Sequence, residues 1–197
     1  MLLGSEEDEI VFTSGGSEAN NLAIKGTFFA LKHKVAHIIT TAIEHPAVLS
    51  PCRLIEQLGG SVTYLPVDRT GRVDPDDVGR AITPQTVLIS IMHANNEVGT
   101  IQPLEEIGAI ARQHGIRFHT DAAQSVGKIP TKVDSLSVDM LTIAGHKLYA
   151  PKGVGALYVR RGLELEPAIH GAGHELGRRA GTESALLAVG LGTADGG

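Results

Sequence analysis

Residues 138 to 153 are VDMLTIAGHKLYAPKG, an apolar run that leads into a basic pair and then into a turn rich in glycine and proline. The run Val138–Ile143 is typical of a buried β-strand, and the Gly and Pro residues mark where it ends. Lys147 is therefore expected at a strand end. An amine that loses solvent at such a place becomes a nucleophile toward carbonyl groups, so the pattern predicts a Schiff-base lysine. Taken alone, one of 17 basic residues is more often part of a solvated surface.

Two other predicted strand ends carry groups that suit a phosphorylated ring. Asp121 follows the apolar strand expected at Ile116–Thr120, and a carboxylate buried there needs a partner such as a protonated ring nitrogen. Ser14–Ser17 (Ser-Gly-Gly-Ser) follows a strand at Glu9–Thr13 and opens a helix. Small residues and free N–H groups at a helix start favour phosphate, although an ordinary helix cap would look the same. Together with Lys147, these groups predict one cofactor site at three strand ends.

Composition limits the class of protein. The chain has 197 residues, 42% of them hydrophobic, and a formal net charge of −5, which indicates one globular domain. Nucleic acid is not an expected partner, because basic residues form no cluster. A membrane is not expected either, because no apolar run reaches the roughly 18 residues that span a bilayer. The start lacks the basic region of a signal peptide, and the single cysteine cannot form an internal disulfide. We therefore expect a cytoplasmic protein.

Strands and helices alternate along the chain, which is typical of an α/β fold. Strands are predicted at residues 9–13, 37–41, 61–67, 86–93, 116–120, 138–143 and 153–160, and helices at 17–31, 47–58, 74–82, 103–114 and 184–191. The link between the last two strands is too short for a crossover helix, so the strand at 153–160 should run antiparallel. The prediction is a three-layer fold with a mostly parallel sheet, helices on both faces and one antiparallel strand.

Polar residues also follow two further strands. His45 comes just after the strand at 37–41, where an imidazole could stack on a cofactor ring and move protons. A histidine that caps the next helix is an equally good explanation. Asn95, Asn96 and Glu97 follow the strand at 86–93, and they either bind a ring or form a turn.

Several other signals favour no second site. Cys52 lies inside a predicted helix and is typical of a core cysteine. His170 and His174 have a spacing that binds zinc only on a helix, and the surrounding glycines argue against one. Gly153–Tyr158 lacks the third glycine of a dinucleotide motif, so an NAD-dependent oxidoreductase is disfavoured.

Six motifs, spread over nearly the whole chain, are together similar to those of one enzyme family. The chain resembles the cysteine desulfurases, class-V-aminotransferase-like enzymes that use pyridoxal 5′-phosphate (PLP) and that include the selenocysteine lyases. The motifs are FTSGGSEANN at 12–21, EH at 44–45, HANNEVG at 93–99, HTDAAQSVGK at 119–128, GHK at 145–147 and RRAGTE at 178–183. The resemblance implies the large domain of a fold type I PLP-dependent transferase.

The resemblance also implies a role for each residue around the cofactor ring. Lys147 would form the Schiff base with PLP, and Asp121 would pair with the ring nitrogen. His45 would stack over the ring, which makes it and Lys147 the two catalytic residues. Asn96 and Gln124 would bond the ring's substituents.

The same family pattern places the phosphate group. Gly16, Ser17 and His146 would hold it, and Thr182 would reach the phosphate of a partner subunit, which implies a homodimer. Ala144 is a departure, because many members have a serine there that contacts the phosphate. Its loss removes one hydrogen bond, about 1 kcal/mol. Some selenocysteine lyases are also apolar at this place, so the resemblance leaves the preference between cysteine and selenocysteine open. No metal site is implied.

The function implied is the removal of sulfur from L-cysteine, which leaves L-alanine and an enzyme persulfide. The sulfur would pass to an acceptor protein for iron–sulfur cluster or thio-cofactor assembly. Alternatives are a selenocysteine lyase, another lyase or aminotransferase of the same class, and a non-catalytic module that binds a full-length partner.

The family's persulfide cysteine, its first segment and its C-terminal small domain have no counterpart in this sequence, and Cys52 occupies no matching position. We therefore expect a fragment with little or no activity of its own. Residues 1–191 would be the PLP-binding large domain, incomplete at its N-terminus, and residues 192–197 would form a tail.

Overall fold

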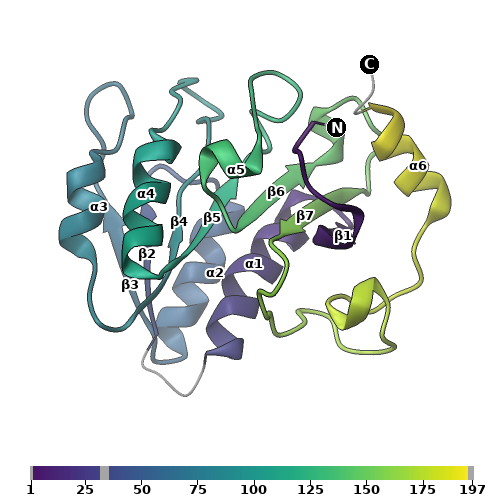
Figure 1. Ribbon diagram of the computed structural model, residues 1–197, viewed down its shortest axis with the longest axis horizontal. Helices are drawn as coiled ribbons and strands as arrows, with labels where there is room; N and C mark the ends of the chain where they lie inside the picture. Colours follow the sequence, from purple (N-terminus) through teal and green to yellow (C-terminus); the bar gives the residue numbers. More distant parts are fainter. Residues whose placement is uncertain (1, 32–35, 195–197) are drawn as a thin grey trace.

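A computed structural model describes residues 2–31 and 36–194, and these residues form a seven-stranded sheet (Figure 1). The strand order is β1-β7-β6-β5-β4-β2-β3. Every neighbouring pair is parallel except the two that include β7, so the prediction of one reversed strand is confirmed. The strands are β1 Ile10–Thr13, β2 His37–Thr41, β3 Ser61–Leu65, β4 Thr86–Ser90, β5 Arg117–Asp121, β6 Met140–Ala144 and β7 Gly155–Val159.

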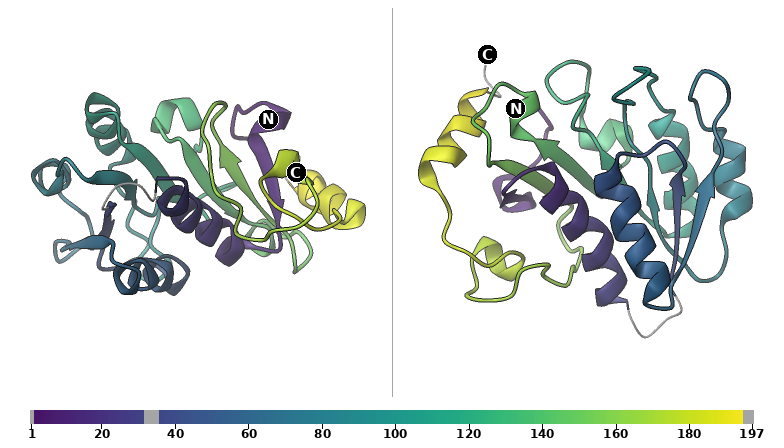
Figure 2. Two further views of the ribbon diagram at one scale, coloured as in Figure 1. Left: turned by 90° about the horizontal axis from the view of Figure 1, so that it is seen from below. Right: turned by 180° about the vertical axis from the view of Figure 1, so that it is seen from behind.

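Helices cover both faces of the sheet, as predicted. In Figure 1, α3, α4 and α5 lie in front of the sheet and α1 and α2 behind it, and Figure 2 shows the layers from below and from behind. The helices are α1 Gly16–Ala30, α2 Pro46–Gln57, α3 Pro75–Ala81, α4 Leu104–His114, α5 Val133–Leu136 and α6 Ala185–Ala194. None of the helices in the described ranges is both long and apolar enough to cross a membrane.

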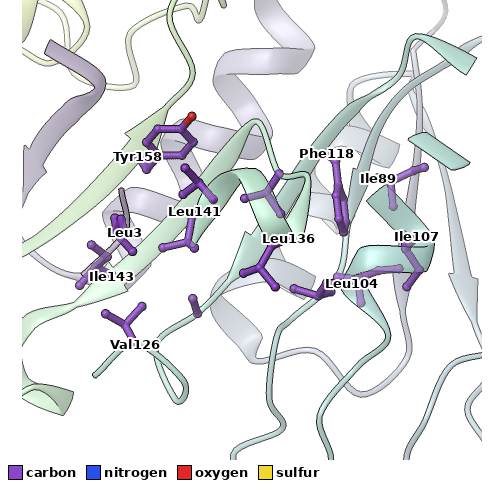
Figure 3. Close-up of a cluster of buried hydrophobic side chains, with 14 of the residues drawn as sticks. Leu3, Ile89, Leu104, Ile107, Phe118, Val126, Leu136, Leu141, Ile143 and Tyr158 are labelled. Carbon is purple, nitrogen blue, oxygen red and sulfur yellow. The ribbon is translucent and has the colours of Figure 1, made fainter. Parts of the chain in front are cut away.

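The sheet divides the core into two apolar clusters. Successive strand residues point to opposite faces, so Ile38 packs with the residues of α1 and α2, and Ile39 packs on the side of α4. Figure 3 shows part of the larger cluster, in which Phe118 and Leu141 share a face of the sheet with Ile107 of α4. Strands β2, β4, β6 and β7 are buried at every residue, which fixes the positions of the loops at their ends.

Some predicted boundaries were wrong. The regular part of β4 ends at Ser90, before the predicted His93, although His93 N still donates to Asp121 O at 2.9 Å. Helix α6 continues to Ala194, beyond the predicted end at Leu191, because its small and apolar residues keep helical spacing. Residues 192–194 of the predicted tail at 192–197 are therefore helical, and residues 195–197 lie outside the described ranges. The one-turn helix α5 was not predicted.

Candidate active site

A polar cavity of about 310 Å³ lies where the parallel strands end. The loops after β1, β2, β4, β5 and β6 each contribute to its wall, because parallel strands end at the same edge of a sheet. All of the predicted site residues except Thr182 are brought together there. The cavity is lined, among others, by Gly16, Ser17, His45, Asn96, Asp121, Gln124, His146 and Lys147.

Asp121 is the buried acid of this cavity. Only 7% of the residue is exposed, and its two oxygens accept hydrogen bonds from different donors. Asn20 Nδ2 donates to Oδ2 at 2.7 Å, and Ala123 N donates to Oδ1 at 3.0 Å. Burial raises the pKa of Asp121, whereas these two hydrogen bonds and the charge of His45 act to lower it. A cationic partner in the cavity would add to the stabilisation of the carboxylate.

Asn20 was not among the predicted site residues, although it lies within the motif FTSGGSEANN at 12–21. It is buried on α1 beside Ala19 and Ala23, and a buried amide needs a partner. That requirement was the signal that could have identified it. Since it holds Asp121 from the side of α1, Asn20 links the helix start to the acid.

The start of α1 forms one wall of the cavity. The first N–H groups of a helix have no partner inside the helix, and Gly16 and Ser17, the first residues of α1, line the cavity. Gly15 has φ 153°, which few other residues adopt. A Cβ on Gly155 would come within 2.7 Å of Gly15 Cα, so this loop packs directly on β7. A helix start of this kind favours an anion.

Lys147 and His146 follow β6 in a single 3₁₀ turn, Gly145–Lys147. Gly145 is needed there, because a Cβ would lie 2.7 Å from Val154 O. Both basic residues are exposed at the cavity. The described residues leave Lys147 open to solvent, so the loss of solvent around its amine stays a prediction.

His45 caps the next helix, which is one of the two interpretations of its sequence position, and its contact with a cofactor ring stays a prediction. His45 is the N-cap of α2, where its Nδ1 accepts a hydrogen bond from Ala47 N at 3.1 Å. It also lines the cavity. Because this bond uses the lone pair of Nδ1, the ring proton of the neutral form lies on Nε2. The cap thereby fixes both the tautomer and the position of the ring.

The amides after β4 separate into two roles. Asn95 forms the turn, because its Oδ1 accepts from Glu97 N at 2.9 Å and from Val98 N at 3.0 Å. Its Nδ2 donates to Ile43 O at 3.1 Å. Asn96 is exposed and lines the cavity, and Glu97 does not line it. Of the residues considered after this strand, only Asn96 is placed to contact a ligand.

Thr182 lies in a neighbouring hollow, not in the cavity. Its segment is attached to the start of α1 by Arg179, whose Nε donates to Glu18 Oε1 at 2.7 Å. Burial by itself would raise the pKa of Glu18, but hydrogen bonds from Arg179 and Ser14 outweigh it and the pKa is lowered. The predicted contact of Thr182 is with a partner subunit, so it stays a prediction.

Comparison with known proteins identifies the family. Residues 1–194 match the family model of the class-V aminotransferases. The chain belongs to this family. It is 57% identical over 192 residues to a cysteine desulfurase IscS of Dictyoglomus turgidum. The aligned part is 98% of this chain and 49% of that protein. A probable mitochondrial cysteine desulfurase of Dictyostelium discoideum is 52% identical over 195 residues, covering 98% of this chain and 43% of the relative.

Solved structures of class-V aminotransferase relatives have the same fold. The structure described as SspA in complex with cysteine superposes with a TM-score of 0.95 and 52% identity, covering 99% of this chain and 57% of that one. A NifS-like protein has a TM-score of 0.95 and 40% identity, covering 98% and 53%. The chain thus spans about half the length of the curated relatives it matches.

The family's chemistry depends on PLP. The two histidines whose spacing suggested zinc, His170 and His174, each make a different contact. His170 Nε2 lies 3.2 Å from Glu166 Oε1, and His174 Nδ1 accepts a hydrogen bond from Gly181 N at 3.2 Å. Within residues 2–31 and 36–194, no group of three or more His, Cys, Asp or Glu residues is arranged to hold a metal ion. Cys52 is fully buried, so its prediction as a core cysteine is confirmed.

Proposed function

We propose that this chain provides the cofactor-binding domain of a PLP-dependent cysteine desulfurase. Such an enzyme takes sulfur from L-cysteine and leaves L-alanine and an enzyme persulfide. The observation that carries the proposal is that Lys147, from the turn after β6, lines the same cavity as the buried carboxylate of Asp121 at the end of β5. The family membership and the cysteine desulfurases among the relatives support it.

The residues present fit this cofactor. The start of α1 offers free N–H groups and glycines for a phosphate, and a buried carboxylate that is already held by two donors suits a protonated ring nitrogen. When bound, PLP supplies an electron-withdrawing ring. Residues 1–191, with α6 extending to Ala194, would form the large domain.

The chain's own residues would then act as follows. Asp121 Oδ1 and Oδ2 would keep the proton on the ring nitrogen. Lys147 Nζ would hold the cofactor at its aldehyde carbon and, as a free amine, would move the proton at the substrate's α-carbon. His45 would lie against the ring and hold a proton at Nε2, while Asn96 and Gln124 would orient the ring's edge.

Sulfur transfer needs a reactive thiolate, and Cys52 is not one. Burial raises the pKa of Cys52 to about 12. A thiol in this state is inert as a nucleophile. Since Cys52 is the single cysteine of the sequence, persulfide formation in our proposal uses a cysteine outside these 197 residues.

The partners and the location belong to the same proposal. We expect a homodimer in which Thr182 contacts the partner's phosphate, and an acceptor protein that uses the sulfur for iron–sulfur cluster assembly. The name IscS of several relatives supports the latter. A cytoplasmic location is supported by the use of only one cysteine.

A spectroscopic titration tests the assignment of the lysine. Adding PLP to the purified chain should produce a visible absorption band that is absent in Lys147→Ala. Lys152→Ala is the matched control, because Lys152 is an exposed lysine on the same loop that does not line the cavity. An unchanged band in Lys147→Ala, or equal loss in both variants, would reject the assignment.

A selenocysteine lyase is the second candidate, and Ala144 is the observation that favours it. Its methyl faces the phosphate loop, where a Cβ on Gly16 would lie 3.2 Å from Ala144 Cβ, and no hydroxyl is present. Alanine formation from cysteine and from selenocysteine, measured with the complete protein, separates the two enzymes. A non-catalytic module would instead bind a full-length relative and release no alanine from either substrate.

A further inference from the structure

A second buried carboxyl group lies beside the cavity. Glu44 is 4% exposed and comes just before His45 in the loop after β2. Its Oε1 accepts two hydrogen bonds, from Thr41 Oγ1 at 2.7 Å and from Met92 N at 2.9 Å. Its Oε2 is buried and has no hydrogen-bond partner among the described residues. Both donors therefore serve one oxygen of the carboxyl group.

Glu44 and Asp121 differ in how many of their two carboxyl oxygens accept a hydrogen bond. Asp121 has a donor on each oxygen, which suits a carboxylate. Glu44 has donors on one oxygen only, which suits a carboxylic acid, with Oε1 as the carbonyl and Oε2 as the hydroxyl. Leaving a charged oxygen buried without a donor costs much more than leaving a neutral hydroxyl there. Two neighbouring carboxylates would also repel each other.

We propose that Glu44 is a neutral, protonated positioning residue. Its carboxyl group ties the end of β2, and so the loop that carries His45, to the chain after β4, where Met92 lines the cavity. Of the two buried acids, the charge is thereby left on Asp121. The protonation of Glu44 is a property of the folded chain, and only its consequence for PLP rests on the proposed function.

The groups that interact with Glu44 are consistent with a neutral acid. Burial raises the pKa of Glu44 to about 8, although the hydrogen bonds from Met92 and Thr41 act to lower it, and Asp121 raises it further. From α2, the thiol of Cys52 also faces it. Neither Asp121 nor Cys52 supplies positive charge that would favour the ionised form of Glu44.

Infrared spectroscopy tests the protonation directly. At pH 7 the chain without cofactor should show the C=O stretch of a protonated carboxyl group, and this band should be absent in Glu44→Gln. Glu105→Gln, which alters an exposed glutamate, is the control and should leave the band unchanged. A band that persists in Glu44→Gln, or that disappears in Asp121→Asn instead, would overturn the proposal.

Unfolding as a function of pH gives a second measure, which also covers a variant that folds poorly. Because the pKa of Glu44 is raised from 4.5 to about 8 in the folded state, its neutral form stabilises the fold below pH 4.5. That contribution is lost as the pH rises through about 8. The unfolding midpoint of the wild type should fall over this window more than that of Glu44→Gln, which cannot ionise. Parallel pH profiles would contradict the proposal.

The positioning role has its own readout in cofactor affinity. Glu44→Gln keeps an acceptor for Thr41 and Met92, so its dissociation constant for PLP should match that of the wild type. Glu44→Ala leaves both donors unsatisfied and should bind about tenfold more weakly, which corresponds to about 1.4 kcal/mol. Equal weakening by both variants would refute positioning by a neutral acid. If the wild type binds no PLP, the proposed function fails, but the infrared and unfolding results still decide the state of Glu44.

Discussion

The sheet body, residues 10–159, and the segment that follows it, residues 160–194, differ in how their apolar side chains are covered. In the body, four strands are buried at every residue. In the segment, Leu176, Leu186 and Val189 are 75%, 80% and 67% exposed, and α6 lies at the edge of the molecule (Figure 1). The body therefore holds most of the apolar core, and among the described residues of the segment only Ala180 and Leu191 are buried apolar residues.

The largest expected effect is a core substitution in the body. Phe118 is fully buried between β5 and α4, so Phe118→Ala should lower the free energy of unfolding by about 3–5 kcal/mol. Leu186→Ala, at an exposed site, should change it by less than about 0.5 kcal/mol. Chemical denaturation of both variants measures the difference. Similar losses would mean that the segment belongs to the same cooperative core.

An intermediate effect is expected where the segment is attached. The Arg179–Glu18 ion pair has side chains only 20% and 12% exposed, so Arg179→Ala should cost about 1–2 kcal/mol. The released segment should then be cleaved faster in limited proteolysis around residues 164–184. Arg178→Ala removes an exposed hydrogen bond to Asp8 O and is the matched control. Equal cleavage of both variants would argue against this attachment.

The same ion pair predicts a dependence on pH. The pKa of Glu18 is lowered from its ordinary 4.5, so its contribution to stability is present above pH 4.5 and is lost as the pH falls below that value. Acidification should therefore speed cleavage of the wild-type segment and leave Arg179→Ala little changed. The difference between the two proteins would disappear in acid.

The smallest effect on stability is expected at the exposed apolar residues of α6. Leu186→Ser and Val189→Ser should change the free energy of unfolding by less than about 0.5 kcal/mol. They should nevertheless reduce self-association of the chain, because exposed apolar patches promote it. Sedimentation velocity measures this. A wild-type chain that stays monomeric at high concentration would contradict the expectation.

Much of the fold followed from the sequence because the body is strongly patterned. Apolar runs bounded by glycine, proline and polar residues predicted all seven strands. The short link before β7 predicted that this strand runs antiparallel to β6. Strand order could not be predicted, because it depends on contacts between residues far apart in the chain. The end of α6 was missed because exposed apolar residues such as Leu186 and Val189 do not mark where a helix ends.

For the candidate site, the sequence predicted several residues that line the cavity but not the hydrogen bonds that connect them. Strand ends located Asp121 and Lys147, since polar residues after apolar strands gather at one edge. The bond between Asn20 and Asp121 joins residues 101 positions apart, and no local pattern contains it. The exposure of Lys147 was also unpredictable, because solvent access depends on everything packed around a residue.

The place of β7 between β1 and β6 has a consequence for synthesis of the protein. Ile10 pairs with Tyr158, and Thr13 with Gly155, so β1 has its neighbour only after a strand more than 140 residues later in the chain has been translated. During translation β1 and the glycine loop behind it wait undocked while the later strands emerge from the ribosome. Pairing over such a separation is slow to form, so the glycine loop that we propose for the phosphate should reach its place late in folding.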